Sequence, residues 1–293
     1  MSKILKALEK AQRDRELEII KDRPVAAPSG SRPLEKGGKP FETLWSKKKE
    51  VVVYDQRLAP FFQPGSLAAE QFRKLRTHLL RLKVSHSPRT ILVTSALDGE
   101  GKTLVATNLA AGIAYDLHSF ALLVDCDLRN PRLGYWFGLP DAKGLSEYLT
   151  GAWEIPELLM KTEVDKLSIL PGGSPLKNPT ELIASKKMEN LVQELKSRYN
   201  DRYIIFDSTP LLATSEPEIL SRLVDGVLIV IRAGATPRET IQQAIASVEK
   251  GKILGFVLND LQFKSSGLAS RYFGAGEYYS RYSDGSRGSK MKI

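Results

Sequence analysis

The sequence contains a single cysteine, Cys126, and it has no long uncharged apolar run. One cysteine cannot form a disulfide framework or an all-cysteine zinc site within a chain. No apolar run reaches the roughly 18 residues that cross a bilayer, so no transmembrane helix is expected. The N-terminal residues alternate charged with apolar side chains and lack the continuous apolar segment of a signal peptide. These absences predict a cytoplasmic protein.

The net charge of +9 is concentrated at the two ends of the chain. Residues 1–50 contain 13 Lys and Arg against 8 Asp and Glu, residues 264–293 contain 6 against 2, and residues 51–263 contain 24 of each. A nucleic-acid-binding domain would carry its basic charge on a folded face, so we expect no nucleic-acid partner. Basic ends on a neutral centre either are simply solvated or contact an acidic partner, an anionic membrane surface or a neighbouring subunit.

The chain divides into four parts by composition. Residues 1–21 carry apolar residues at helical spacing among dense charge, which predicts a short amphipathic helix. Residues 22–50 are rich in Pro and Gly, which is typical of a flexible linker. Residues 51–263 are expected to form the folded domain. Residues 264–293 contain 5 Gly and 7 Ser, so we expect a flexible basic tail.

The expected folded domain alternates apolar strands with helical stretches. Strands rich in Ile, Leu and Val and joined by helices predict an α/β fold, with a doubly wound, mostly parallel sheet of about seven strands and helices on both faces. The expected strands are Val51–Tyr54 at an edge, Thr90–Thr94, Ala121–Asp125, Leu167–Leu170, Tyr203–Asp207, Gly226–Ile231 and Ile253–Asn259. The expected helices are Leu67–Lys83, Lys102–Asp116, Pro179–Ser197, Glu216–Leu223 and Pro237–Lys250.

A glycine-rich turn at residues 96–103 joins the first core strand to the next helix. Glycines let backbone N–H groups approach phosphates, and the helix N-terminus adds its dipole. This turn departs from the G-x-x-x-x-G-K-[ST] consensus at Ala96, and it retains the strand–loop–helix context that the P-loop requires. We therefore expect an ATP and Mg²⁺ site rather than a turn with a chance Lys-Thr pair. The residues expected to contact the nucleotide phosphates are Asp98, Gly99, Glu100, Gly101, Lys102, Thr103 and Leu104.

Carboxylates stand at the ends of two other expected strands. Asp125 and Asp127 are two residues apart, which places them on one side of an extended backbone, and Asp207 ends a later strand. Ligands bind at the carboxyl ends of parallel strands, so these acids are expected beside the phosphate loop. We predict that Thr103 and Asp125 hold Mg²⁺ and that Asp207 binds it through water. Cys126 is expected to face away from the site as a small buried residue.

At these motifs the sequence resembles the bacterial tyrosine kinases of the capsule and exopolysaccharide type. Residues 89–103 resemble the family's Walker A motif, with Asp98 where a proline is usual. Residues 122–131 resemble its Walker A′ motif, and residues 203–210 resemble its Walker B motif. The resemblance extends over about residues 51–285.

The resemblance implies a P-loop protein-tyrosine kinase that uses ATP and Mg²⁺. Lys102, Asp125 and Asp127 are the expected catalytic residues, with Asp127 orienting or deprotonating the acceptor phenol. Asn259 resembles the family's adenine-side residue. The resemblance also implies autophosphorylation in trans, which would regulate capsule or exopolysaccharide polymerisation and export.

Two further features agree with this family. Glu70, Arg73 and Arg76 form an i, i+3 row on an expected helix. The pattern alone favours a solvated helix face, whereas the resemblance implies a subunit contact of a ring-like homo-oligomer, where this row lies in the family. Four of the ten tyrosines stand among Gly, Ser and Arg in the tail. We expect these to be phosphoacceptors rather than part of a tyrosine-bearing binding tail: Tyr272, Tyr278, Tyr279 and Tyr282.

The resemblance also implies a separate membrane partner, a chain-length or co-polymerase protein that activates the kinase at the inner face of the membrane. The N-terminal helix would dock to that partner or to anionic lipid. Two alternatives remain. A partitioning or cell-division ATPase of the ParA or MinD type would carry an extra lysine early in the loop, where residues 95–98 have none. A non-kinase ATPase that assists polysaccharide export would bind ATP without forming phosphotyrosine.

Overall fold

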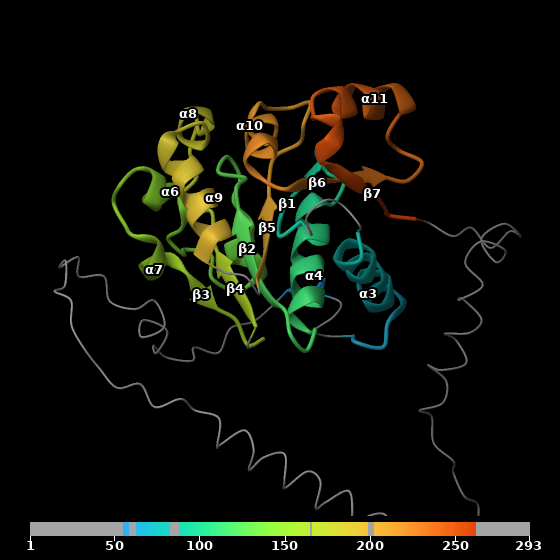
Figure 1. Cartoon of the computed structure of the whole chain (residues 1–293), viewed down its shortest axis with the longest axis horizontal. Coiled ribbons are helices and arrows are strands. Elements are labelled where there is room, and N and C mark those ends of the chain that lie inside the picture. The colour runs from blue at the N-terminus through green and yellow to red at the C-terminus, as the bar shows by residue number, and fades with distance from the viewer. Residues whose placement is uncertain (1–54, 59–62, 83–87, 165, 199–201, 262–293) are drawn as a thin grey trace, which may run out of the picture. The chain divides into compact units, whose positions relative to one another are not determined.

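The computed structural model describes one folded domain, drawn in colour in Figure 1. The predicted N-terminal helix, linker, Val51–Tyr54 strand and tyrosine-rich tail lie outside the described residues. Among the described residues, none of the helices combines the length and the apolar composition that a membrane-spanning helix needs. The described residues are 55–58, 63–82, 88–164, 166–198 and 202–261.

A seven-stranded sheet runs through the domain in the order β3-β4-β2-β5-β1-β6-β7 (Figure 1). Neighbouring strands are parallel throughout, except that β3 is antiparallel to β4. This arrangement confirms the predicted doubly wound, mostly parallel sheet. The strands are β1 (Thr90–Ser95), β2 (Phe120–Asp125), β3 (Met160–Lys161), β4 (Leu167–Leu170), β5 (Arg202–Asp207), β6 (Gly226–Arg232) and β7 (Ile253–Asn259).

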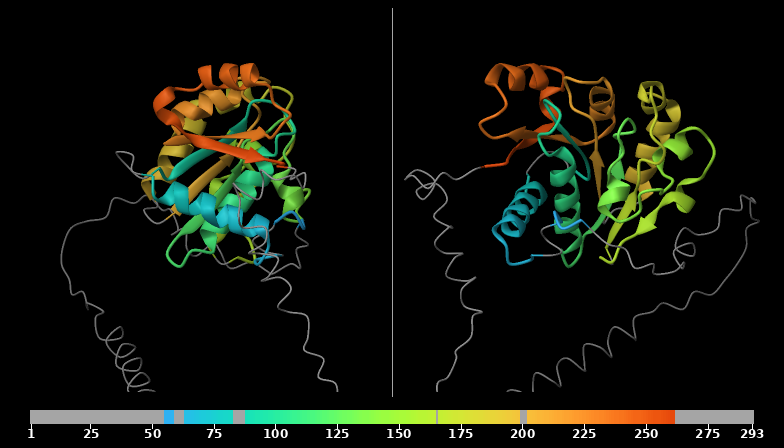
Figure 2. Two further views of the ribbon diagram at one scale, coloured as in Figure 1. Left: turned by 90° about the vertical axis from the view of Figure 1, so that its right-hand side faces the viewer. Right: turned by 180° about the vertical axis from the view of Figure 1, so that it is seen from behind.

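Helices cover both faces of the sheet (Figure 2). One apolar core lies between the sheet and α3, α4 and α5, and the other lies between the sheet and α6, α9, α10 and α11. Because both faces are covered, the central strands are buried at nearly every residue, as their unbroken apolar runs predict. The helices are α3 (Leu67–Leu80), α4 (Lys102–Ala114), α5 (Leu133–Trp136), α6 (Leu145–Leu149), α7 (Ile155–Leu158), α8 (Thr180–Ile183), α9 (Lys186–Arg198), α10 (Glu216–Leu223) and α11 (Arg238–Ala246).

The helices expected over Leu67–Lys83 and Lys102–Asp116 end slightly earlier, at Leu80 and Ala114, and two other predicted helices differ more. The helix expected over 179–197 is divided at Ser185, whose hydroxyl donates to the carbonyl of Leu182 and accepts from the N–H of Met188. Serine thus ends α8 and caps the start of α9, a role for which its short polar side chain is suited. The helix expected over 237–250 ends at Ala246 and is followed by a separate 3₁₀ turn at Lys250–Lys252.

The register of the central strands brings the acidic strand ends together. Asp125 of β2 is directly paired with Asp207 of β5, and Asp207 lies beside Val93 of β1. The phosphate loop begins just after Ser95, at the same edge of the sheet. The fold therefore positions the loop and both strand-end carboxylates at one edge.

Candidate active site

The phosphate loop has the backbone that its glycines predict. Gly99 and Gly101 have φ angles of 76° and 92°, which only glycine adopts easily. At Gly101 a Cβ would also meet Nδ2 of Asn259, which would have to move to make room. Ala96 is fully buried in the apolar core and has no positive φ, so glycine is not needed at that position. No side chain caps α4, which leaves its first N–H groups available to an anion.

Lys102 is buried at the start of α4 between two carboxylates. Its Nζ atom lies 3.3 Å from Oδ1 of Asp98 and 3.8 Å from Oδ2 of Asp127. The charge of Lys102 holds the pKa of the largely exposed Asp98 below its usual value. Burial raises the pKa of Asp127 although Lys102 opposes the shift. The ammonium group is therefore positioned to meet anionic oxygens that enter the loop.

Asp125 is fully buried and binds the turn that follows β2. Its Oδ1 accepts the N–H of Asp127 at 3.1 Å, and its Oδ2 accepts the N–H groups of Arg132 and Leu133, each at 3.0 Å. Burial, followed by the charge of Asp127, raises the pKa of Asp125 to about 7, although the hydrogen bonds oppose the shift. Asp125 thus fixes the conformation of the Walker A′ turn.

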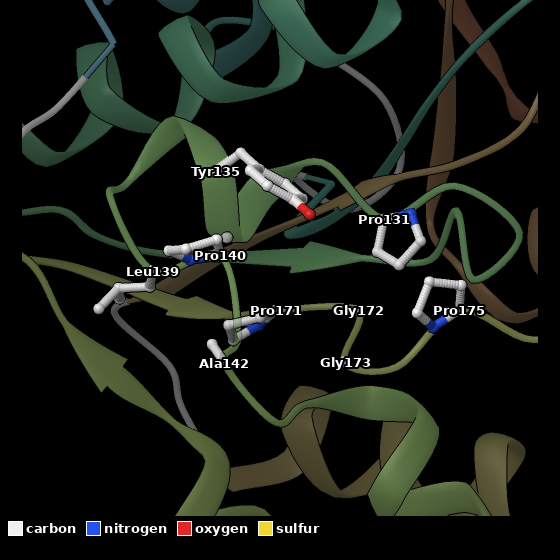
Figure 3. Close-up of a pocket in the computed structure, with 10 residues that line it drawn as sticks. Pro131, Tyr135, Leu139, Pro140, Ala142, Pro171, Gly172, Gly173 and Pro175 are labelled. Carbon is white, nitrogen blue, oxygen red and sulfur yellow. The ribbon is translucent and has the colours of Figure 1, made fainter.

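A small pocket with a volume of about 40 Å³ lies beside this turn (Figure 3). Prolines and glycines make up most of its walls, including Pro131, Pro171 and Gly172. A Cβ at Gly172 would lie 2.6 Å from Cβ of Pro131 and 3.3 Å from Cγ of Asp125. Glycine at this position therefore lets the turn after β4 pack directly against the Walker A′ turn.

Asp207 is the strand-end acid with a free oxygen. Its side chain is buried, and its Oδ1 has no hydrogen-bond partner among the described residues. Burial and the charge of Asp125 raise its pKa well above the usual value, while a hydrogen bond from the Thr103 side chain opposes the shift. An unpaired buried carboxylate oxygen beside a hydroxyl suits Mg²⁺, which needs few protein ligands because it retains water and binds phosphates.

Asp125, Asp127 and Asp207 do not form a ready-made metal cage. Within the described part of the chain, no three His, Cys, Asp or Glu side chains are close enough to hold a metal ion together. In addition, both oxygens of Asp125 already accept hydrogen bonds from backbone N–H groups. Direct binding of Mg²⁺ by Thr103 and Asp125, and water-mediated binding by Asp207, remain predictions.

Cys126 is buried in the apolar core, as predicted. Burial, together with the nearby carboxylates of Asp125 and Asp207, raises the pKa of its thiol well above the usual value. The thiol therefore stays protonated at neutral pH and acts as a small apolar side chain.

Glu100, which we predicted to contact phosphate, uses its side chain to hold the loop. Its Oε2 accepts the Leu97 N–H at 2.7 Å, and its Oε1 accepts the Arg232 N–H at 3.2 Å and the Thr236 hydroxyl. Its backbone carbonyl accepts Nδ2 of Asn259 at 2.8 Å. The buried carboxylate therefore connects the phosphate loop to the segment after β6, and Asn259 connects the loop to the end of β7. The sequence motif gave no indication of this role.

We expect Glu100→Gln to weaken ATP binding about tenfold, roughly the effect of one lost hydrogen bond to a buried charged group. In the variant, the NH₂ group of the glutamine amide would face the N–H of either Leu97 or Arg232, and that hydrogen bond would be lost. Thr236→Val should weaken binding less, and Thr236→Ser, which retains the hydroxyl, should bind ATP normally. Calorimetric titration with ATP measures the three affinities. Normal affinity in Glu100→Gln would contradict this role for the carboxylate.

The Walker A′ segment is also anchored by an ion pair that the sequence did not predict. Arg129 donates from Nη2 to Oε1 of the buried Glu216 at 2.7 Å, and Thr180 donates to the same oxygen at 2.9 Å. These contacts join the segment after β2 to the starts of α8 and α10. The guanidinium of Arg129 is therefore held by α8 and α10.

The Glu70, Arg73 and Arg76 row lies on α3, as predicted, but its members have contacts within the protomer. Arg73 pairs with Glu70 at 2.6 Å and donates to the carbonyl of Pro64 at 2.8 Å. Arg76 donates to the carbonyl of Gly112 at 3.0 Å and so binds α3 to α4. A role of this row in a subunit contact remains a prediction.

The raised pKa of Asp125 predicts how the stability of the metal-free protein varies with pH. The native state keeps a proton on Asp125 up to about pH 7, whereas the unfolded chain loses it near pH 3.8. The free energy of unfolding should therefore fall as the pH rises through this window. We expect Asp125→Asn to make the decrease of stability with pH shallower, measured as Tm against pH in EDTA. Part of the decrease should remain, because the pKa of Asp207 is also raised. An unchanged slope would show that Asp125 does not titrate in the window.

The fold and the site define a P-loop nucleotide-binding domain, and comparison with known proteins identifies its family. Residues 88–254 match the family described as an AAA domain. The chain is 34% identical over 199 residues to tyrosine-protein kinase YwqD of Bacillus subtilis, a match that covers 67% of this chain and 83% of that protein. The chain belongs to the bacterial tyrosine-protein kinase family, as its motifs predicted, and it is a protein-tyrosine kinase by that membership.

Solved structures support the same assignment. The kinase domain of Escherichia coli tyrosine kinase ETK has a TM-score of 0.68 at 26% identity, covering 78% of this chain and 89% of that one. The chimerical protein CapA2B2 has a TM-score of 0.66 at 29% identity, covering 71% and 92%. Both likenesses extend well beyond the phosphate loop.

Proposed function

We propose that this kinase transfers the γ-phosphate of ATP to tyrosines in the C-terminal cluster of a neighbouring copy of the chain. The observation that carries the proposal is the grouping at one sheet edge of an uncapped helix N-terminus, the buried Lys102, and Asp127 3.8 Å from its ammonium group. The tail that bears the tyrosines begins soon after β7. We infer that the acceptors are Tyr272, Tyr278, Tyr279 and Tyr282.

The loop residues have distinct roles toward the triphosphate. Gly99 and Gly101 let the backbone N–H groups converge on the phosphate oxygens, and the first turn of α4 adds its dipole. Lys102 exchanges its carboxylate neighbours for phosphate oxygens and neutralises their charge. Such positioning and charge neutralisation account for most of the catalysis of phosphoryl transfer. Asn259, which is already bonded to the loop carbonyl of Glu100, would border the adenine side.

For Mg²⁺ we propose to exchange the roles that the sequence suggested for the two strand-end acids. Thr103 and Asp207 would hold the ion directly, and Asp125, whose oxygens already accept backbone N–H groups, would support them. This assignment is supported by the unpaired Oδ1 of Asp207 and by the Thr103 side chain that is hydrogen-bonded to the same carboxylate. At this position the ion would supply positive charge that offsets the charge developing on the phosphate oxygens during transfer.

Asp127 is the residue that would receive the acceptor proton. The tyrosine oxygen forms a bond to the γ-phosphorus, the bond from that phosphorus to the bridging oxygen of ADP breaks, and the phenolic proton passes to the Asp127 carboxylate. Burial raises the pKa of Asp127, which makes it a better proton acceptor than an exposed aspartate. Products are phosphotyrosine and ADP.

The family membership supports a role in capsule or exopolysaccharide synthesis. We infer that phosphorylation of the tail regulates polymerisation and export, that a membrane chain-length or co-polymerase protein activates the kinase, and that this partner recruits it to the inner face of the membrane. A ring-like homo-oligomer, with α3 at the contact, would bring each tail to a neighbouring site.

Mapping of phosphotyrosine after incubation with ATP and Mg²⁺ tests the proposal. We expect mass spectrometry to find phosphate on the C-terminal cluster, and replacement of its four tyrosines by phenylalanine to remove most of the incorporated phosphate. Tyr115→Phe, at an exposed tyrosine elsewhere, is the matched control. ATP hydrolysis without phosphotyrosine would instead identify an ATPase that assists polysaccharide export.

A further inference from the structure

A hollow of about 340 Å³ opens beside the Walker A′ turn and has no part in the mechanism above. This volume is at the lower end of the range for sites that bind small molecules. We call it the Arg132 hollow. Its walls come from two segments, the short stretch before α3 and the turn that leads into α5, and its lining residues are Asp55, Arg57, Asn130, Pro131, Arg132, Tyr135 and Trp136.

One wall of the Arg132 hollow is a fixed, charge-compensated stack. Arg57 makes two hydrogen bonds to Asp55, at 2.8 and 2.5 Å, and its guanidinium lies 4.2 Å from the centre of the Trp136 ring. The Asp55 N–H donates to the Trp136 carbonyl, and the Arg57 carbonyl accepts from Asn108. This wall therefore offers the flat face of the Arg57 guanidinium, whose charge is balanced by Asp55.

Arg132 supplies the cationic group of the hollow that has no carboxylate paired with it among the described residues. Its side chain is exposed, and no carboxylate among the described residues lies within ion-pair distance of it. The amide oxygen of Asn130, in the orientation that satisfies both groups, accepts from its Nε at 3.2 Å and its Nη2 at 2.9 Å. The guanidinium is thus oriented by a neutral partner. It is also close enough to Asp98 and Asp127 that its charge acts to lower the pKa of both carboxylates.

This combination selects the chemistry of a ligand. A guanidinium with no carboxylate partner binds phosphate through two parallel hydrogen bonds. Tyr135, 65% exposed, and the Arg57 surface offer flat faces on which an aromatic ring can stack. A phosphate attached to an aromatic ring satisfies both features at once, whereas a free phosphate leaves the stacking surfaces unused.

We propose that the Arg132 hollow binds the side chain of phosphotyrosine, presented by the tail of a second copy of this chain. The identity of the occupant rests on the proposed function, because phosphotyrosine is the product of the neighbouring transfer site. Binding there would hold a partly phosphorylated tail beside Asp127 while a further tyrosine is presented to the phosphate loop.

The test is a calorimetric titration of the full chain with N-acetyl-phosphotyrosine amide, in saturating Mg²⁺ and ADP so that the phosphate loop is occupied. The Lys102→Met chain, which is expected to form very little phosphotyrosine of its own, is titrated with the probe in the same way. We expect one saturable site, weakened about tenfold or more by Arg132→Gln and clearly by Tyr135→Ser. Arg222→Gln, at an exposed arginine paired with Glu218, should bind normally. N-acetyl-tyrosine amide and inorganic phosphate should bind far more weakly.

Three results would overturn the proposal: normal binding in a folded Arg132→Gln chain, equal affinity for inorganic phosphate, or complete loss of binding when ADP is present. The last result would place the probe in the phosphate loop. Because the titration requires no transfer activity, a chain that binds the probe but lacks kinase activity would contradict the proposed function and leave this site standing.

Discussion

Replacing Lys102 by methionine is expected to lower tyrosine autophosphorylation by about 100- to 1000-fold, the usual cost of losing one group that stabilises the charge of the transition state. Methionine has a similar length but carries no charge. Lys102 is buried and faces Asp98 and Asp127, so no solvent ion replaces it easily. The rate of phosphotyrosine formation at saturating ATP, measured by quantitative mass spectrometry, gives the effect.

Lys186→Met is the matched control for Lys102→Met. Lys186 is an exposed lysine at the start of α9 that pairs with Glu189 on its own helix, so its loss should leave the rate unchanged. Both variants should have the Tm of the wild type within a few degrees. Retained tail phosphorylation in a folded Lys102→Met protein would show that transfer does not occur at this loop.

Asp207→Asn is expected to change activity and stability in opposite directions. Phosphoryl transfer should fall by about 100-fold, because the neutral amide is a weaker ligand for Mg²⁺ than the carboxylate proposed to bind it. The metal-free protein should become more stable by about 1–3 kcal/mol near pH 8, because the neutral amide removes a buried negative charge that lies next to Asp125. The raised pKa of Asp207 makes this gain larger as the pH increases above about 4.

Thermal unfolding in EDTA and transfer rates over a range of Mg²⁺ concentrations measure the two effects of Asp207→Asn. Asp141→Asn, at an exposed aspartate, should change neither. A loss of both stability and activity in Asp207→Asn would instead assign the carboxylate a structural role, and full activity would remove it from the site.

The sequence predicted the central strands and the phosphate loop because both depend on local chemistry. Strands buried on both faces read as unbroken apolar runs, and the core strand ends agree with prediction within one residue. Gly99 and Gly101 are recognisable because the loop requires positive φ angles that other residues rarely adopt. The strand-end acids follow from the parallel topology, since carboxyl ends of such strands meet at one edge.

The features that the sequence did not predict depend on distant contacts. The Glu100 carboxylate accepts hydrogen bonds from Arg232 and Thr236, which are more than 130 residues away in the sequence. No local sequence pattern reveals such partners. The sequence pattern predicts Arg76 to be a solvated surface residue of α3, but its guanidinium donates a hydrogen bond to a carbonyl of α4. Strand β3 has only two residues, too few for any periodic signal, and it exists because it pairs with β4.

A mixing experiment tests the central claim, transfer from this phosphate loop to the tail of another copy, most directly. One chain carries Lys102→Met with its tail intact, and the other has a normal loop with Tyr272, Tyr278, Tyr279 and Tyr282 replaced by phenylalanine. Neither alone should form tail phosphotyrosine, whereas the mixture with ATP and Mg²⁺ should place phosphate on the tail of the Lys102→Met chain. A mixture that leaves those tyrosines unmodified while the wild-type chain phosphorylates its own would contradict the account.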